Sequence, residues 1–156
     1  MLGLIKHAIL ATDLALFFPN RAKLTVLVEE ERFSWGNSEH RLLVQAIAMT
    51  ASDLSAAAKP WDIQKTTVKV IFEEFYEQGD AERLAGRIPI PMMDRNMPEE
   101  QANSQVGFLN GICIPCYKLL FRLIPETEPL LAMCQQNLDR WEAVATKTQT
   151  KQEPNY

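Results

Sequence analysis

One carboxylate stands alone in the most apolar stretch of the chain. Between Leu42 and Ala58 the only charged residue is Asp53. A carboxylate can bind a divalent cation, and a buried one needs a metal ion, a cation or several N–H groups to stay ionised. No lysine or arginine lies three or four residues from Asp53 in the sequence. Three alternatives therefore stay open: a metal ligand, a carboxylate that meets a distant cation or N–H groups, or a helix face more exposed than its composition suggests.

Further metal ligands are scarce in the sequence. Its two histidines, His7 and His40, are not at ligand spacing from each other. Cys113 and Cys116 form a C-x-x-C, but neither a second ligand pair nor a βαβ pattern accompanies them. We therefore interpret the cysteines as small core residues of a helix, and both histidines as surface or boundary residues.

A glutamine and a phenylalanine three residues apart form a second candidate site. Gln105 and Phe108 share one face if their segment is helical. A primary amide can hydrogen-bond to the edge of a flat heterocycle while an aromatic ring stacks on its face. On spacing alone the ordinary alternative is stronger, because phenylalanine on an apolar helix is usually core and glutamine is usually on the surface.

Composition and charge narrow the functions to be considered. The chain has 156 residues, enough for one domain, and a net charge of −4 without any lysine or arginine run. This excludes the electrostatic footprint of a nucleic-acid partner. No apolar run reaches the ~18 residues of a membrane span. The start, MLGLIKHAIL, lacks a cationic leader and a cleavage site. We expect no membrane span and a cytoplasmic location.

The spacing of apolar residues predicts helices joined by short loops, and no strand. The expected helices are 4–18, ended by Pro19-Asn20; 21–33; 38–58, capped by Ser38 and closed by Lys59-Pro60; 61–85, followed by Gly86; 99–123, kinked at Pro115; and about 127–146. The proline-rich segment 87–98 should be irregular. Asp53 then points from the middle of an apolar helix face. Because the opposite face is apolar too, we expect this helix to be buried.

Several separate motifs give the chain a resemblance to a known family. In order they are ILATDLALFF, MTASDLSAAAKPW, EFYEQGD, IPIPMMDRN, QVGF and DRWEAVA. They resemble the C-terminal half of the catalytic domain of class I 3',5'-cyclic-nucleotide phosphodiesterases, in the group whose catalytic domain follows GAF domains. The resemblance implies an all-α, compact multi-helix bundle. It implies that residues 1–146 are a partial catalytic domain, and we expect the polar tail 147–156 to be disordered.

The resemblance also implies roles for single residues. Asp53 matches one ligand of the zinc site, in a centre that holds zinc and magnesium. Gln105 matches the glutamine that hydrogen-bonds the purine edge, and Phe108 the ring that stacks on the purine. Gln64 matches a position whose amide orients that glutamine, and Trp141 an aromatic residue that helps to close the pocket. Further positions match the pocket wall: Leu54, Ile71, Phe75 and Met92.

The activity implied is hydrolysis of cyclic GMP, cyclic AMP or both to 5'-monophosphates by two-metal catalysis. The family's other metal ligands and its general-acid histidine lie in motifs that this chain begins after. We therefore expect no catalytic residue here and no turnover by the chain alone. Ala56 stands where cAMP-selective members carry asparagine, which favours cyclic GMP or dual use. The resemblance also allows a homodimer of the full-length protein. The alternative is a non-catalytic helical interaction module derived from such a half-domain.

Overall fold

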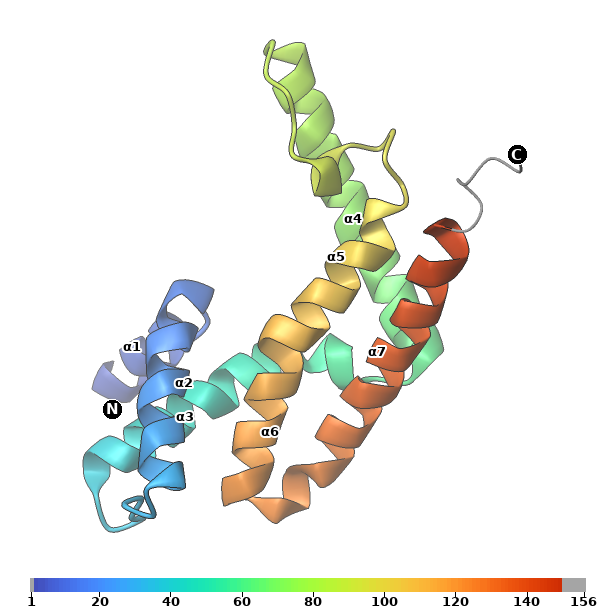
Figure 1. Cartoon of the computed structure of the whole chain (residues 1–156). Coiled ribbons are helices and arrows are strands. Elements are labelled where there is room, and N and C mark those ends of the chain that lie inside the picture. Colours follow the sequence, from blue (N-terminus) through green and yellow to red (C-terminus); the bar gives the residue numbers. More distant parts are fainter. Residues whose placement is uncertain (1, 150–156) are drawn as a thin grey trace. The chain divides into compact units, whose positions relative to one another are not determined.

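The computed structural model describes residues 2–149, and their regular structure is entirely helical (Figure 1). The all-α prediction is confirmed over these residues. The α-helices are α1 (Leu2–Leu10), α2 (Leu14–Glu29), α3 (Ser38–Asp53), α4 (Trp61–Leu84), α5 (Glu100–Phe108), α6 (Ile114–Leu123) and α7 (Glu128–Gln149). Shorter turns are η1 (Ser55–Ala58), η2 (Pro91–Met93), η3 (Leu109–Cys113) and η4 (Pro125–Thr127), of which η3 is a π turn.

The chain divides into two units. The first comprises Met1–Ser55 and Cys113–Leu131, and the second comprises Ala56–Ile112 and Ala132–Tyr156. The first therefore holds α1, α2, α3 and α6. The second holds α4, α5 and most of α7.

In the first unit, α2 and α6 pack against α3. The buried residues there include Phe17, Leu24, Val44, Ile47, Leu119 and Leu120. The predicted core role of the cysteines is confirmed, because Cys113, Cys116 and Cys134 are all buried. Helix α1 packs on α3 without burying any residue of its own. Its His7 is half-buried, with Nε2 2.8 Å from the carbonyl oxygen of Leu42.

The boundary between the first two helices differs from the prediction. Pro19 lies inside α2, and the break falls at residues 11–13. Asp13 caps α2, because its carboxylate accepts a hydrogen bond from the N–H of Ala15 at 2.9 Å. Proline lacks an N–H and costs the helix one hydrogen bond. Burial of Phe17 within the same turns offsets that loss.

Two further boundaries also differ from the prediction. Asn37, not Ser38, caps α3, since its side chain accepts hydrogen bonds from the N–H groups of Glu39 and His40. Helix α7 continues to Gln149 instead of ending near residue 146, so the first three residues of the predicted tail are helical. The rest of that tail, 150–156, lies outside the described residues.

The end of α4 follows the prediction. Gly86 has φ +74°, a left-handed conformation that glycine adopts without strain. Its N–H donates to the Arg83 carbonyl at 3.0 Å, and the N–H of Arg87 donates to the Glu82 carbonyl at 2.9 Å. This Schellman motif reverses the chain. The irregular segment 87–98, which we call the strap, then runs back beside α4 to α5 (Figure 1).

The helix predicted at 99–123 is divided by the π turn η3. Pro115, in the first turn of α6, has no N–H to give to the preceding turn, and a π turn absorbs such an interruption. By length and composition alone, Glu100–Leu123 would suffice to span a membrane, and α1 with α2 would do so only as a pair bent by 100°. Tyr117, Leu119 and Leu120 of this stretch are buried, as in the core helix of a folded domain.

Candidate functional site

Asp53 is the last residue of α3, in the first unit, and its side chain is exposed. The third alternative for this residue, a helix face more exposed than its composition suggests, is therefore the one observed, while Ala46, Ile47 and Thr50 of the same helix are buried. The predicted helix end near Ala58 is wrong. The hydroxyl of Tyr117 donates to the carbonyl oxygens of Ala51 and Leu54, at 3.1 Å each. In a longer helix the Ala51 carbonyl would accept from the N–H of residue 55. The buried tyrosine thus ends the α-helix at Asp53, and residues 55–58 form η1 instead.

The carboxylate of Asp53 lies where a helix favours it least. The C-terminal end of a helix carries partial negative charge, and the last turn of α3 contains no basic residue. Among residues 2–149, no group of three or more His, Cys, Asp or Glu side chains is placed to hold a metal ion. Zinc and magnesium sites need several ligands. The described residues therefore do not form a metal site by themselves.

The second unit brings Gln64 and Gln105 together. The indole N–H of Trp141 donates to Gln64 Oε1 at 2.8 Å. Because an indole only donates, this bond identifies which end of the Gln64 amide is the oxygen. Gln64 Nε2 then donates to Gln105 Oε1 at 3.5 Å. We call this chain of two hydrogen bonds, from α7 through α4 to α5, the relay.

The relay sets the orientation of the Gln105 amide. Its oxygen faces Gln64, and its Nε2 is left as a donor. Gln105 and Phe108 are both half-buried on α5, whereas Gln64 and Trp141 are 2% and 3% exposed. Guanine carries an acceptor oxygen where adenine carries a donor amino group. An amide held in one orientation therefore distinguishes the two purine edges.

A residue that the sequence analysis missed supports the relay. Asn137 lies one turn before Trp141 on α7 and is 1% exposed. Its Nδ2 donates to the carbonyl oxygens of Ala57 and Lys59, at 3.0 and 2.8 Å. The ring of Trp61 meets the Trp141 ring edge-on, with centroids 5.1 Å apart. Helix α7 thereby fixes the start of α4. In the sequence, Asn137 could have been recognised as a single amide on the apolar face of α7.

The predicted wall residues are divided between the units. Ile71 and Phe75 lie on α4, and Met92 lies in η2, all in the second unit. Turn η2 packs against both α4 and α5, the helices that carry the two glutamines. Leu54, like Asp53, belongs to the first unit.

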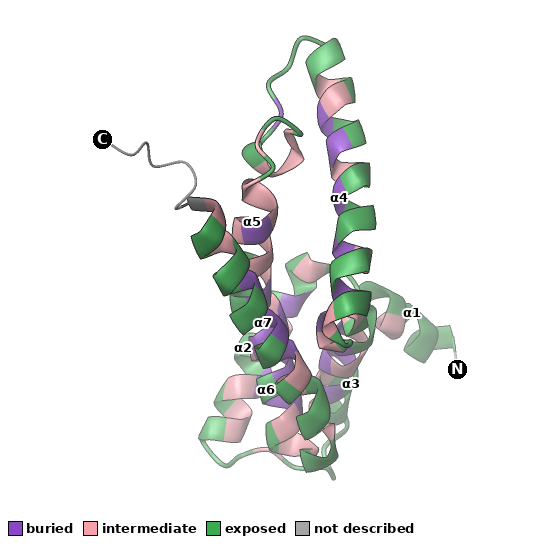
Figure 2. Cartoon of the chain, turned by 90° about the vertical axis from the view of Figure 1, so that its right-hand side faces the viewer, coloured by how far each residue is buried: buried purple, intermediate pink, exposed green. Residues whose placement is uncertain are grey.

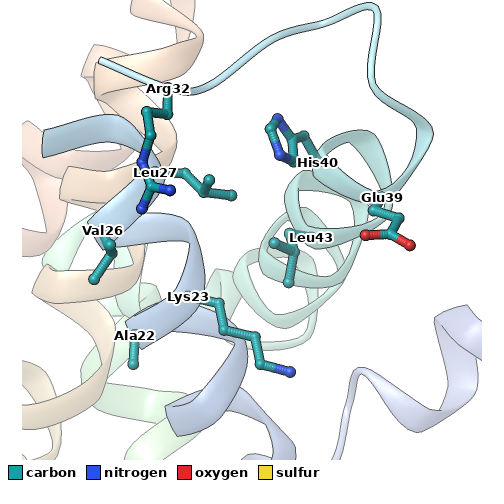
Figure 3. A pocket seen from close by; sticks show the side chains of 8 residues that line it. All are labelled: Ala22, Lys23, Val26, Leu27, Arg32, Glu39, His40 and Leu43. Carbon is teal, nitrogen blue, oxygen red and sulfur yellow. The ribbon is translucent and has the colours of Figure 1, made fainter. Parts of the chain in front are cut away.

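A groove of about 640 Å³ lies between α2 and α3 in the first unit (Figure 3). Leu27 and Leu43 extend into it from the two helices, and Arg32 and His40 lie toward one end (Figure 3). The Nδ1 atom of His40 accepts a hydrogen bond from the Ser34 N–H at 3.1 Å, and the imidazole is half-buried, as a boundary residue should be. None of the predicted site residues lines this groove.

Replacing Trp141 by phenylalanine is expected to destabilise the chain by about 1–3 kcal/mol, because the buried Gln64 oxygen loses its donor. The free energy of unfolding in urea measures this effect. Trp61→Phe is the control, since it alters the neighbouring ring and leaves the relay in place. Equal destabilisation by the two variants would show that the relay adds nothing beyond ring packing.

Comparison with known proteins adds independent information. The family described as "3'5'-cyclic nucleotide phosphodiesterase" matches residues 1–134. A Caenorhabditis elegans protein named "Probable 3',5'-cyclic phosphodiesterase pde-5" is 56% identical over 152 residues, 97% of this chain and 21% of that protein. A dual 3',5'-cyclic-AMP and -GMP phosphodiesterase of Takifugu rubripes is 38% identical, over 96% of this chain and 17% of its own length. A cGMP-specific 3',5'-cyclic phosphodiesterase of Drosophila melanogaster is 39% identical, over 93% and 13%. The chain thus spans about a fifth or less of these relatives.

Proposed function

The chain belongs to the 3'5'-cyclic nucleotide phosphodiesterase family, and we propose that it supplies the purine-binding side and one metal ligand of a domain that hydrolyses cyclic nucleotides. The family predicted from the motifs, a family of phosphoric diester hydrolases, is confirmed. The relay supports the proposal most directly, because an amide of fixed orientation beside an aromatic ring suits a purine.

Each predicted site residue of the second unit has a role in this proposal. Gln105 hydrogen-bonds the purine edge, Phe108 stacks on its face, and Gln64 orients Gln105. Trp141 holds Gln64 and helps to close the pocket. The proposed wall residues of this unit are Ile71, Phe75 and Met92. The substrate is cyclic GMP or both cyclic nucleotides, which accords with Ala56 and with the names of the cGMP-specific and dual relatives.

Asp53 is the proposed metal ligand of this chain, in a two-metal centre for zinc and magnesium. In this proposal the other ligands and the general acid come from the upstream motifs of the family, and residues 2–149 hold no group of three or more metal-binding side chains. The proposal therefore includes no turnover by the chain alone. It also includes a cytoplasmic location and no nucleic-acid partner, and it allows a homodimer of the full-length protein.

The test is a chimera in which this chain replaces the matching segment of the Caenorhabditis elegans relative. The chimera is expected to hydrolyse cyclic GMP or cyclic AMP, whereas the isolated chain is not. In the chimera, Gln105→Ala should raise KM roughly tenfold or more with a smaller change in kcat, because this amide binds the purine and does not touch the reacting phosphate. Gln101→Ala, one turn earlier on α5, is the matched control.

Two results would contradict the proposal. One is an inactive chimera beside an active parent enzyme. The other concerns the isolated chain: hydrolysis that disappears on Asp53→Ala would show that the chain does not need outside ligands. A chimera in which Gln105→Ala and Gln101→Ala behave alike would leave the activity standing and remove Gln105 from the pocket.

A second candidate function is a non-catalytic interaction module, and α1 favours it. No residue of this helix is buried, and Leu4, Ile5 and Ile9 are 56%, 51% and 65% exposed. Contiguous exposed apolar side chains mark interaction surfaces. Because these side chains are exposed in either case, binding of a hydrophobic dye is expected of both functions, and the chimera distinguishes them: an active chimera is expected of a catalytic half-domain, and an inactive one of an interaction module.

A further inference from the structure

The strap lies directly against the backbone of α4. Gly79 is a buried position of α4, and a Cβ atom placed on it would be 2.0 Å from the carbonyl oxygen of Met93 in η2. The strap therefore touches the helix with no side chain between the two backbones. In Figure 2 the buried positions of α4 recur along one side of the helix, including the upper part that the strap accompanies.

The backbone of the strap makes few hydrogen bonds to α4. Its three prolines, 89, 91 and 98, have no N–H to donate. Between its two ends, where the Arg87 N–H donates to Glu82 of α4 and the Met97 and Pro98 carbonyls accept from α5, its backbone hydrogen bonds run within the strap, as from Met93 N–H to the Ile90 carbonyl at 2.8 Å. Ile88 and Ile90 are 95% and 53% exposed, whereas Pro89 is buried and Met92, Met93 and Met97 are half-buried, so apolar burial at these positions also holds the strap. Docking of the strap depends on side chains.

Arg95 makes several of these side-chain contacts. Its Nε donates to Asp80 Oδ2 at 2.8 Å, and its Nη1 lies 3.6 Å from Glu73 Oε2. Its guanidinium carbon lies 5.4 Å from the centre of the Tyr76 ring, in a cation–π contact. Residues 73, 76 and 80 are spaced three and four apart, so they present one face of α4. One side chain of the strap thus contacts three side chains of the helix.

Asp94 forms a further ion pair, in which the strap carries the negative charge and α4 the positive one. Its Oδ2 lies 2.6 Å from Nη2 of Arg83 on α4, and its Oδ1 accepts from the Asn96 N–H at 2.9 Å. The hydrogen bond from Asn96 and the Arg83 guanidinium both lower the pKa of Asp94. The hydrogen bond with Asp80 raises the pKa of Arg95 above its ordinary value. The charges of the strap are therefore held in their ionised forms by α4 and by the strap itself.

We propose that Arg95 is a positioning residue for the purine pocket. Arg95 holds the strap on α4 and thereby holds Met92 at the pocket wall. Turn η2 carries Met92 and packs against both α4 and α5, so its placement affects the space between these helices. This inference rests on the proposed function, in which Met92 belongs to that wall. Exposed ion pairs contribute little to stability. The main effect of Arg95 is accordingly on the position of the strap and not on unfolding.

The chimera tests the consequence for substrate binding. Arg95→Ala should raise KM roughly tenfold and leave kcat within about twofold, because the proposed role of Met92 is at the wall of the purine pocket and not at the reacting phosphate. Arg95→Lys should lie between wild type and alanine, since a lysine keeps the charge without the planar fork. Arg87→Ala removes an exposed arginine from the same strap and is the control. Adding Asp80→Ala to Arg95→Ala should raise KM no further, because the two side chains act as a pair.

A second measurement uses the isolated chain and no catalysis. In methyl-labelled protein the Met92 and Met93 signals should shift or broaden in Arg95→Ala, while those of Met49 on α3 and Met133 on α7 should not. Unchanged Met92 and Met93 signals would overturn the inference, even if the chimera is inactive and the proposed function fails. An active chimera in which Arg95→Ala lowers stability but leaves KM unchanged would overturn it too, because Arg95 would then be structural only.

Discussion

Asp53→Asn is expected to abolish hydrolysis by the chimera, with a loss of roughly 100-fold or more, because even residues that only support a metal ligand cost up to that much. The same change should leave the stability of the isolated chain unchanged or raise it by about 0.3–1 kcal/mol. The reason is its position: an exposed carboxylate ends α3 with no basic residue in the last turn, so it opposes the charge of the helix end.

The control for this pair of measurements is Asp62→Asn. Asp62 lies in the first turn of α4, where a negative charge is favourable, so its loss should lower stability slightly. It has no role in the proposed site, and the chimera should keep its activity. Hydrolysis by the chimera measures the effect of each variant on activity, and urea unfolding of the chain measures its effect on stability. If Asp53→Asn destabilises the chain by more than Asp62→Asn and spares hydrolysis, Asp53 is a structural residue and not a ligand.

Gly79→Ala is expected to have the largest effect on stability. The new methyl group would overlap the Met93 carbonyl, a backbone atom that cannot rotate away. Overpacking of this kind costs about 1–3 kcal/mol, or more where the backbone must move. The strap should separate from α4, so the chimera should also bind its substrate less tightly. Urea unfolding of the chain and KM of the chimera measure the two effects.

Gly107→Ala provides the matched control on α5. Nothing lies within 4 Å of a Cβ atom at Gly107, and the residue is exposed. Alanine there should stabilise the helix by about 0.5–1 kcal/mol. The same substitution in two helices thus has opposite expected signs. Equal effects at both positions would mean that the strap does not press on Gly79.

Local patterns predicted much of the fold because their causes are local. Gly86 ends α4 through its own backbone conformation, and the prolines of 87–98 exclude a regular helix whatever surrounds them. Pro19 was misread as a helix end because the N-cap at Asp13 and the burial of Phe17 decide that boundary. The family followed from motifs whose order and spacing are properties of the sequence alone.

The errors at the candidate site have tertiary causes. No property of residues 42–58 reveals that a tyrosine more than sixty positions later ends α3 and leaves Asp53 exposed. The relay likewise joins residues on three helices, and only the resemblance connected Gln64 with Gln105. Gly79 lies in the EFYEQGD motif, yet its close contact with Met93 depends on where the strap returns.

The relay gives the chain a built-in optical reporter. Of its tryptophans, Trp141 is buried and donates its indole N–H to Gln64, whereas Trp35 is 50% exposed. The emission of an indole depends on its hydrogen bond and on the polarity around it. A purine that turns the Gln105 amide would alter the bond that Gln64 makes to Trp141. Fluorescence of Trp141 could then follow nucleotide binding by the unlabelled chain and report whether the arriving base is guanine or adenine.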